Sequence, residues 1–198
     1  KDLKILKKLK VNFVYTPIKN EVYSSKNKIK IHLSKKDKIL CAKYRKGHFE
    51  GVIDVMCRLT NIVKPSKIFM GEKDFQQLIL VKKYIENNFK SKIVLCKTIR
   101  DKNKLALSSR NLLLKKSDQI KAGKIAKTLI SFKKKFFKKN ITKRLILTKK
   151  KELEKLYGVN IEYLELRNRK NLKLSNRINN SKIFLGYYLN NIRLIDNF

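Results

Sequence analysis

Residues 67–77 carry the side chains best suited to chemistry, in the order Lys-Ile-Phe-Met-Gly-Glu-Lys-Asp-Phe-Gln-Gln. The pattern predicts a short apolar strand, a tight charged turn and the first turn of a helix. Gly71 is expected to supply backbone freedom, and Asp74 and Gln77 have capping-box spacing. Lys73 lies where free N–H groups and the helix dipole favour an anion. The segment therefore predicts a phosphate or carboxylate site, although an ordinary capped turn with solvated charges fits it equally well.

The elements around this segment indicate an open α/β layer. Apolar faces at helical spacing predict helices over residues 52–63 and 75–89. Short apolar stretches at 68–70 and 93–96 predict strands. Helix, strand, helix and strand with short links imply parallel strands with crossover helices. The charged turn would then lie beyond the carboxyl end of a strand, where such sheets bind ligands.

The last hundred residues predict a small α+β domain. A basic amphipathic helix is expected over residues 117–138, and a second helix over 144–157, which Gly158 ends in the C′ position. Strands are expected at residues 159–167, 182–188 and 191–195. The first helix is expected to turn Ile120, Ile125, Leu129 and Phe132 inward.

The N-terminal part has weaker patterns. Residues 1–10 predict the end of a helix, and residues 11–15 predict a strand that Pro17 ends. Residues 21–37 are irregular, and weak alternation near 29–31 fits either a short strand or a loop.

Positive charge dominates the composition, since 51 Lys and Arg against 15 Asp and Glu give a net charge of +36. Such a charge alone suggests binding to nucleic acid or to a membrane surface. However, the lysines are spread along the chain among many Asn and Ile, and Arg, the better reader of bases, is scarce. A general compositional drift is therefore favoured over a dedicated nucleic-acid surface.

The remaining composition indicates a folded protein of a reducing compartment. Hydrophobic residues make up 42% of the chain, enough for a core. The three cysteines have no C-x-x-C spacing, which argues against a zinc motif and a disulfide framework. No apolar run approaches the roughly 20 residues of a membrane span.

Two segments together resemble the signatures of the pantothenate synthetase (pantoate–β-alanine ligase) family. They are Gly-Glu-Lys-Asp-Phe-Gln-Gln at 71–77 and Leu-Ala-Leu-Ser-Ser-Arg-Asn at 105–111. Residues 45–52 resemble the family's Arg-Pro-Gly-His-Phe-x-Gly-Val segment, and 193–197 its usual end. The resemblance implies an α/β fold, with a Rossmann-like nucleotidyltransferase domain that is incomplete at its N-terminus and a smaller α+β C-terminal lid domain. The division would give domains 1–98 and 99–198.

The resemblance implies an ATP-dependent ligase that supplies the coenzyme A pathway. Pantoate would attack the α-phosphate of ATP, giving pantoyl adenylate and pyrophosphate. The amine of β-alanine would then displace AMP and form pantothenate. The resemblance further implies Mg²⁺ with the ATP, a homodimer in the cytoplasm, and neither a membrane nor a specific nucleic-acid partner.

The resemblance also assigns roles to residues of the turn. Lys73 is expected to contact a phosphate, and Asp74 a hydroxyl or a Mg²⁺-linked group. Gln77 is expected to hydrogen-bond pantoate, and Ile99 to line the adenine pocket through its backbone. The turn residues expected to contact ATP are Gly71, Glu72, Lys73 and Asp74.

A second group of expected site residues lies at 107–110. Two hydroxyls and a guanidinium in this stretch suit a phosphate loop, although Ser108-Ser109-Arg110 without the resemblance would more simply be a helix cap. The expected ATP contacts here are Leu107, Ser108, Ser109 and Arg110, and the expected supports of catalysis are Lys73, Ser108, Ser109 and Arg110.

The chain departs from the family pattern at its front. The family's His-x-Gly-His motif, which contains the assigned catalytic His, and a Gln beyond it are absent, and the only histidines are His32 and His48. His48 is expected to be structural. The simplest interpretation is a fragment without the sheet's first strands, with exposed edges that favour association, weak ATP binding and little or no catalysis. Lys46 replaces a frequent Pro, and Lys104 replaces a usual Gly that takes positive φ without strain.

Three alternatives to an active ligase of this kind remain open. One is an inactive remnant of the ligase. Another is a basic nucleic-acid-binding module, which charge alone supports. The third is a different adenylate-forming nucleotidyltransferase, which would use another carboxylic acid.

Overall fold

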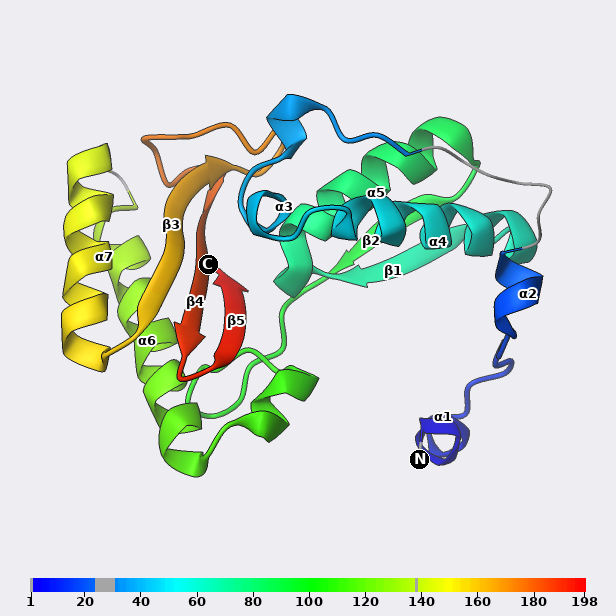
Figure 1. Ribbon diagram of the computed structural model, residues 1–198, viewed down its shortest axis with the longest axis horizontal. Coiled ribbons are helices and arrows are strands. Elements are labelled where there is room, and N and C mark those ends of the chain that lie inside the picture. The colour runs from blue at the N-terminus through cyan, green and yellow to red at the C-terminus, as the bar shows by residue number, and fades with distance from the viewer. Residues whose placement is uncertain (1, 24–30, 138) are drawn as a thin grey trace.

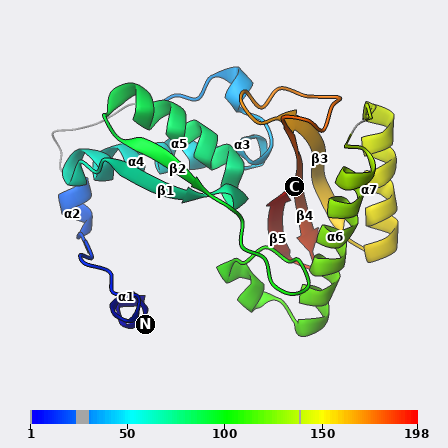
Figure 2. The same ribbon diagram turned by 180° about the vertical axis from the view of Figure 1, so that it is seen from behind.

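The computed structural model describes residues 2–23, 31–137 and 139–198. Its first half contains a parallel two-stranded sheet of β1 (Lys67–Gly71) and β2 (Lys92–Cys96). Helix α5 (Phe75–Asn88) connects the strands, and α4 (His48–Val63) packs beside α5. Both helices cover one face of the sheet (Figures 1 and 2). The predicted parallel strands with a crossover helix are therefore confirmed.

The second half is an antiparallel sheet covered by two helices (Figure 1). Strands β3 (Asn160–Asn168), β4 (Ser181–Leu189) and β5 (Ile192–Asn197) pair in that order. Helices α6 (Lys116–Lys135) and α7 (Lys143–Tyr157) lie against them. Gly158 ends α7 at φ +60°, which confirms the predicted C′ glycine.

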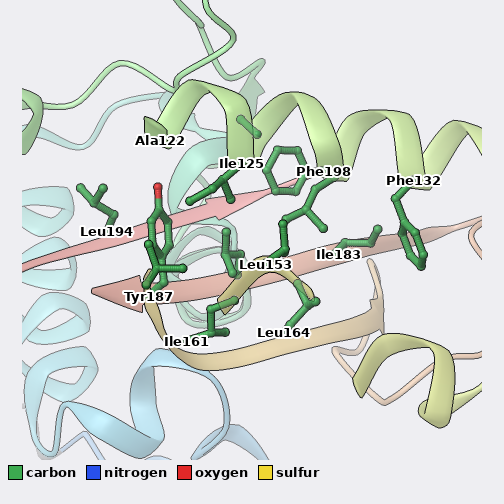
Figure 3. Close-up of a cluster of buried hydrophobic side chains, with 14 of the residues drawn as sticks. Ala122, Ile125, Phe132, Leu153, Ile161, Leu164, Ile183, Tyr187, Leu194 and Phe198 are labelled. Atoms are coloured by element: carbon green, nitrogen blue, oxygen red, sulfur yellow. The ribbon is translucent and has the colours of Figure 1, made fainter. Parts of the chain in front are cut away.

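The core of the second half lies between α6, α7 and the sheet (Figure 3). The buried α6 side chains recur every three or four residues, as in Ala122, Ile125, Leu129 and Phe132. Ile120 lies off this stripe and is 43% exposed, so its predicted inward position is wrong. The helix ends at Lys135, and residue 138 of the predicted helix lies outside the described residues.

The core of the first half joins α4 and α5 to the parallel sheet. Ile53 and Leu78 are fully buried there, and Ile93 of β2 packs with them. Tyr163 of β3 and Phe184 of β4 belong to the same cluster, although they come from the second sheet. The two halves therefore share a packed interface.

The N-terminal part, before α4, contains only short helices among its described residues. Two more short helices form the turns that follow β1 and precede α6. The predicted strand at residues 11–15 is wrong: no described strand pairs with it, and Phe13 is 92% exposed. The predicted helix before it is confirmed, but it buries no side chain. Residues 29–30 of the weak alternation lie outside the described residues, and residue 31 has no regular structure. The short elements are α1 (Asp2–Lys8), α2 (Lys19–Val22), η1 (Lys35–Asp37), α3 (Cys41–Tyr44), η2 (Glu72–Asp74) and η3 (Ser109–Leu113).

Two predictions from composition concern the cysteines and a membrane-spanning segment. The cysteines are free thiols, of which Cys41 and Cys57 are buried and Cys96 is exposed. Among the described helices, none combines the length and the apolar character that crossing a membrane requires.

Lys104 adopts φ +72°, in the left-handed region that favours glycine. It lies in a tight turn in which its N–H donates to the Asp101 carbonyl (2.9 Å). The Leu105 N–H donates to Asp101 Oδ1 (2.9 Å) in the same turn. We expect Lys104→Gly to raise the free energy of unfolding by roughly 0.5–1 kcal/mol, because relief of the strain outweighs the added entropy of the unfolded chain. Urea denaturation measures this change.

The matched control is Lys102→Gly in the same loop, since Lys102 is not among the residues with positive φ. Glycine there adds unfolded-state entropy and relieves no strain, so we expect a loss of roughly 0.4–1 kcal/mol. Changes of the same sign in both variants would contradict the strain argument.

Candidate active site

The charged turn after β1 forms as predicted. However, the predicted roles of Gly71 and Asp74 in forming it are wrong. Gly71 has φ −69° and ψ 131°, an extended conformation that any residue adopts, so its backbone freedom is not required. Asp74 is the N-cap residue of α5 but makes no side-chain cap hydrogen bond, and the predicted capping box with Gln77 does not form. The Asp74 carboxylate instead lies 3.8 Å from the Lys73 Nζ.

The C-terminal strand holds this turn in place. The Asn197 Nδ2 group donates to the carbonyls of Glu72 (2.8 Å) and Lys73 (2.9 Å). The Glu72 carboxylate forms ion pairs with Arg169 (3.2 Å) and Lys182 (3.5 Å) of the second half. The Glu72 side chain therefore ties the two halves together, and it lines neither cavity described below.

A cavity of about 210 Å³ brings the two signature segments together. Lys73 and Asp74 contribute from the first segment, and Ser108, Ser109 and Arg110 from the second. The half-buried Lys73 and Arg110 give this cavity two cationic groups from different halves of the chain. The other lining residues are Arg45, Leu105, Ala106, Asn111, Tyr187, Leu194, Ile195 and Asp196.

The second segment is a capped 3-10 turn. The Arg110 N–H donates to Ser108 Oγ (3.3 Å), as the capping interpretation predicts. The Arg110 Nη1 group donates to the Arg193 carbonyl of β5 (2.9 Å), which fixes the guanidinium near the cavity.

Besides Glu72, three predicted site residues line neither this cavity nor the smaller one described next. Ile99 and Leu107 are exposed on the surface, and the Leu107 N–H donates to the Ile99 carbonyl (2.9 Å). Gly71 is exposed before the turn. Any contact of these residues with a ligand would involve backbone atoms or lie at the outer rim of the site.

A second cavity of about 30 Å³ adjoins the first and contains Gln77. It holds roughly one water-sized volume. Two buried acceptors in its wall, Gln76 Oε1 and Asn197 Oδ1, have no hydrogen-bond partner among the described residues. The two cavities share Arg45, Lys73, Asp74, Ile195 and Asp196, so they adjoin, and together they make up the candidate site.

The site carries an excess of positive charge. Arg45, Lys73 and Arg110 line it, and its acidic residues are Asp74 and Asp196. Burial raises the pKa of Asp196, and the Arg100 guanidinium opposes this rise. Arg100 holds both Asp196 oxygens (2.7 and 2.8 Å), which neutralises that carboxylate. The arrangement is therefore suited to anionic ligands.

The sequence reasoning assigned no role to Arg45 and expected His48 to be structural, but both residues line the site. The Arg45 Nη2 lies 3.2 Å from His48 Nδ1, and both side chains are half-buried in the wall of the small cavity. Burial, followed by the nearby Arg45, lowers the pKa of His48, which favours a neutral ring at pH 7. The only sequence signal for these residues was the family-like segment at 45–52.

In the part of the chain that the structure describes, neither a metal cluster nor the cavity beside β3 and α7 competes with this site. The described residues include no group of three or more His, Cys, Asp or Glu side chains placed to hold a metal ion. A larger cavity of about 1080 Å³ lies beside β3 and α7, but none of the signature residues lines it. The adjoining cavities thus contain the convergent charged groups expected of an active site.

Comparison with known proteins identifies relatives over the full length of the chain. A family model described as pantoate-beta-alanine ligase matches residues 1–198. The pantothenate synthetase of Endomicrobium trichonymphae is 33% identical over 201 residues, which cover 100% of this chain and 70% of that protein. The pantothenate synthetase of Buchnera aphidicola subsp. Schizaphis graminum is 38% identical over 203 residues, with coverage of 99% and 70%.

Solved structures agree with these relatives. Pantothenate synthetase from Thermus thermophilus superposes with a TM-score of 0.88 at 25% identity, covering 100% of this chain and 72% of that one. Pantoate-beta-alanine ligase from Francisella tularensis, complexed with beta-gamma ATP and beta-alanine, gives a TM-score of 0.77 at 32% identity and coverage of 100% and 68%. Sequence, fold and the converged signature segments agree, and the chain belongs to the pantoate–β-alanine ligase family.

Proposed function

We propose how this chain's residues serve the family's reaction, the ATP-dependent ligation of pantoate and β-alanine to pantothenate. Lys73, Asp74 and the turn 108–110 bind the phosphates of ATP, and Gln77 binds pantoate. The observation that carries this proposal is that the two signature segments line one cationic cavity. Gly71, Glu72, Ile99 and Leu107 belong to the proposed ATP site through their backbone atoms or as its rim.

The chemistry of the first step suits these groups. Negative charge builds on the α-phosphate and on the leaving pyrophosphate as the pantoate carboxylate attacks. Lys73 and Arg110 stabilise this charge, and the hydroxyls of Ser108 and Ser109 donate to phosphate oxygens. The β-alanine amine then attacks the acyl carbon of pantoyl adenylate, and AMP leaves. No residue of this chain is proposed as the family's catalytic His.

Mg²⁺ would be bound together with ATP, and it would neutralise phosphate charge there. The Asp74 carboxylate is 48% exposed and lines both cavities. Mg²⁺ commonly binds one or two carboxylates together with phosphate oxygens and water. Asp74 would therefore supply the protein oxygen ligand of the ion.

The proposal includes two domains, 1–98 and 99–198, with the second as a lid. One buried cluster lies wholly within residues 105–198 and most of the other lies within residues 33–93, which supports this division, although Tyr163, Leu172 and Phe184 pack with the first domain. It also includes a homodimer and a location in the cytoplasm. The free thiols of the chain support the location, because the cytoplasm is a reducing compartment. A dedicated nucleic-acid surface is not favoured, because the family relationship accounts for the motifs and charge alone supports that alternative.

Lys73→Met tests the phosphate site. We expect the variant to bind Mg-ATP about tenfold more weakly or worse, since a charge-assisted contact contributes about 1.5–3 kcal/mol. Isothermal titration calorimetry of the chain with Mg-ATP measures the dissociation constant. Lys67→Met is the matched control, because Lys67 is exposed at the far end of β1, the strand that precedes the turn with Lys73. Equal losses in both variants would show only a general effect of charge.

The homodimer makes a separate prediction. Sedimentation equilibrium is expected to give a mass near twice the 23.4 kDa of one chain. The mass should persist in about 0.5 M salt, because association driven by apolar burial is insensitive to screening. A monomer at micromolar concentration would contradict the proposed assembly and leave the ATP site unaffected.

A further inference from the structure

Arg45 occupies the junction of the site. It lines both the cavity of about 210 Å³ that holds Lys73 and Arg110 and the cavity of about 30 Å³ that holds Gln77. Among the described residues, Lys73 is the only other cation common to both walls. In the proposed reaction, this junction is where a carboxylate from the Gln77 side meets a phosphate from the Lys73 side.

Arg45 lacks a carboxylate partner among the described residues, in contrast to Arg193 and Arg100. Arg193 pairs with Glu162 (2.7 Å), and Arg100 pairs with Asp196 (2.7 Å). Within the part of the chain that the structure describes, Arg45 forms none of the ion pairs, and its side chain hydrogen-bonds only to His48. Burial lowers the pKa of Arg45, and the cation of Arg110 lowers it further. A half-buried guanidinium among like charges is stabilised by an anionic ligand.

We propose that Arg45 is a substrate-binding residue that holds the carboxylate of pantoate beside the α-phosphate of ATP. The inference rests on the proposed function and adds the residue that recognises this carboxylate. The planar fork of a guanidinium matches the two oxygens of a carboxylate. A cation at this position also offsets the repulsion between the carboxylate and the phosphate that it attacks.

The position of Arg45 favours pantoate over β-alanine as the carboxylate that it binds. Gln77, the residue proposed for pantoate, lines the same small cavity as Arg45. The phosphates of ATP have Lys73, Arg110 and the two serine hydroxyls in the larger cavity. His48 acts as a positioning residue, because its Nδ1 can accept a hydrogen bond from Arg45 Nη2 at 3.2 Å and orient the guanidinium.

The test compares pantoate with its primary amide, which keeps both hydroxyls and lacks the charge. Protein-observed NMR titrations give the two dissociation constants and hence a preference ratio. We expect the unaltered chain to prefer pantoate by about tenfold or more, and Arg45→Gln to reduce this preference to less than about twofold. Arg45→Lys should give an intermediate ratio, because it keeps the charge and loses the fork.

The positioning role of His48 is measured with the same ratio. His48→Leu removes the acceptor and should lower the preference about threefold to fivefold. His48→Asn places an amide oxygen near the former Nδ1 and should retain the preference. A variant that merely loosened the fold would weaken pantoate and its amide equally and leave the ratio unchanged.

The matched control is Arg144→Gln, an exposed arginine on α7, which should leave the ratio unchanged. Titrations of Arg45→Gln with Mg-ATP and with β-alanine should each lose less affinity than the titration with pantoate. An unchanged pantoate preference in Arg45→Gln would overturn the inference, as would a loss confined to ATP or to β-alanine. If the unaltered chain binds neither pantoate nor ATP, the proposed function itself fails, and the inference fails with it.

Discussion

The double hydrogen bond from Asn197 to the turn after β1 is the contact on which the site depends. The Asn197 amide joins β5 to the carbonyls of Glu72 and Lys73, which lie far from it in the sequence. Asn197 is 3% exposed, so these bonds form away from competing water. They hold Lys73 at a set distance from β5, the strand that also carries Arg193 and Asp196. The ion pairs of Glu72 with Arg169 and Lys182 strengthen the same junction.

The site illustrates why the arrangement of charge matters more than its amount. The chain has 51 basic residues, and only a few of them line the site. Arg45, Lys73 and Arg110 line its cavity of about 210 Å³. Other cations near the site are neutralised: Arg100 by Asp196 and Arg193 by Glu162. The cations of the cavity wall are thus concentrated where phosphates and carboxylates are proposed to meet. Lysines on the outer faces of α6 and α7 are screened by solvent and contribute little at this range.

Sequence reasoning predicted elements well where local patterns and burial agree. The strand, turn and helix at 67–88 form because apolar side chains at 68, 70, 78, 81 and 85 have the right period for a one-sided layer. It was wrong where a pattern needs a partner. Residues 11–15 alternate like a strand, but no described strand pairs with them. Local cap chemistry also misled, because Asp74 faces Lys73 rather than the first turn of α5.

The sequence by itself determined the family, the order of the elements and which segments carry chemistry. Signature motifs are local, and short runs of residues suffice to recognise them. Tertiary structure alone decided that residues 73–74 and 108–110 share a cavity, that the Glu72 side chain turns away from it, and that Arg45 and His48 complete the wall of the site. These facts depend on how β5 packs against η2. That packing is a contact between distant parts of the chain, and neither residue type nor periodicity encodes it.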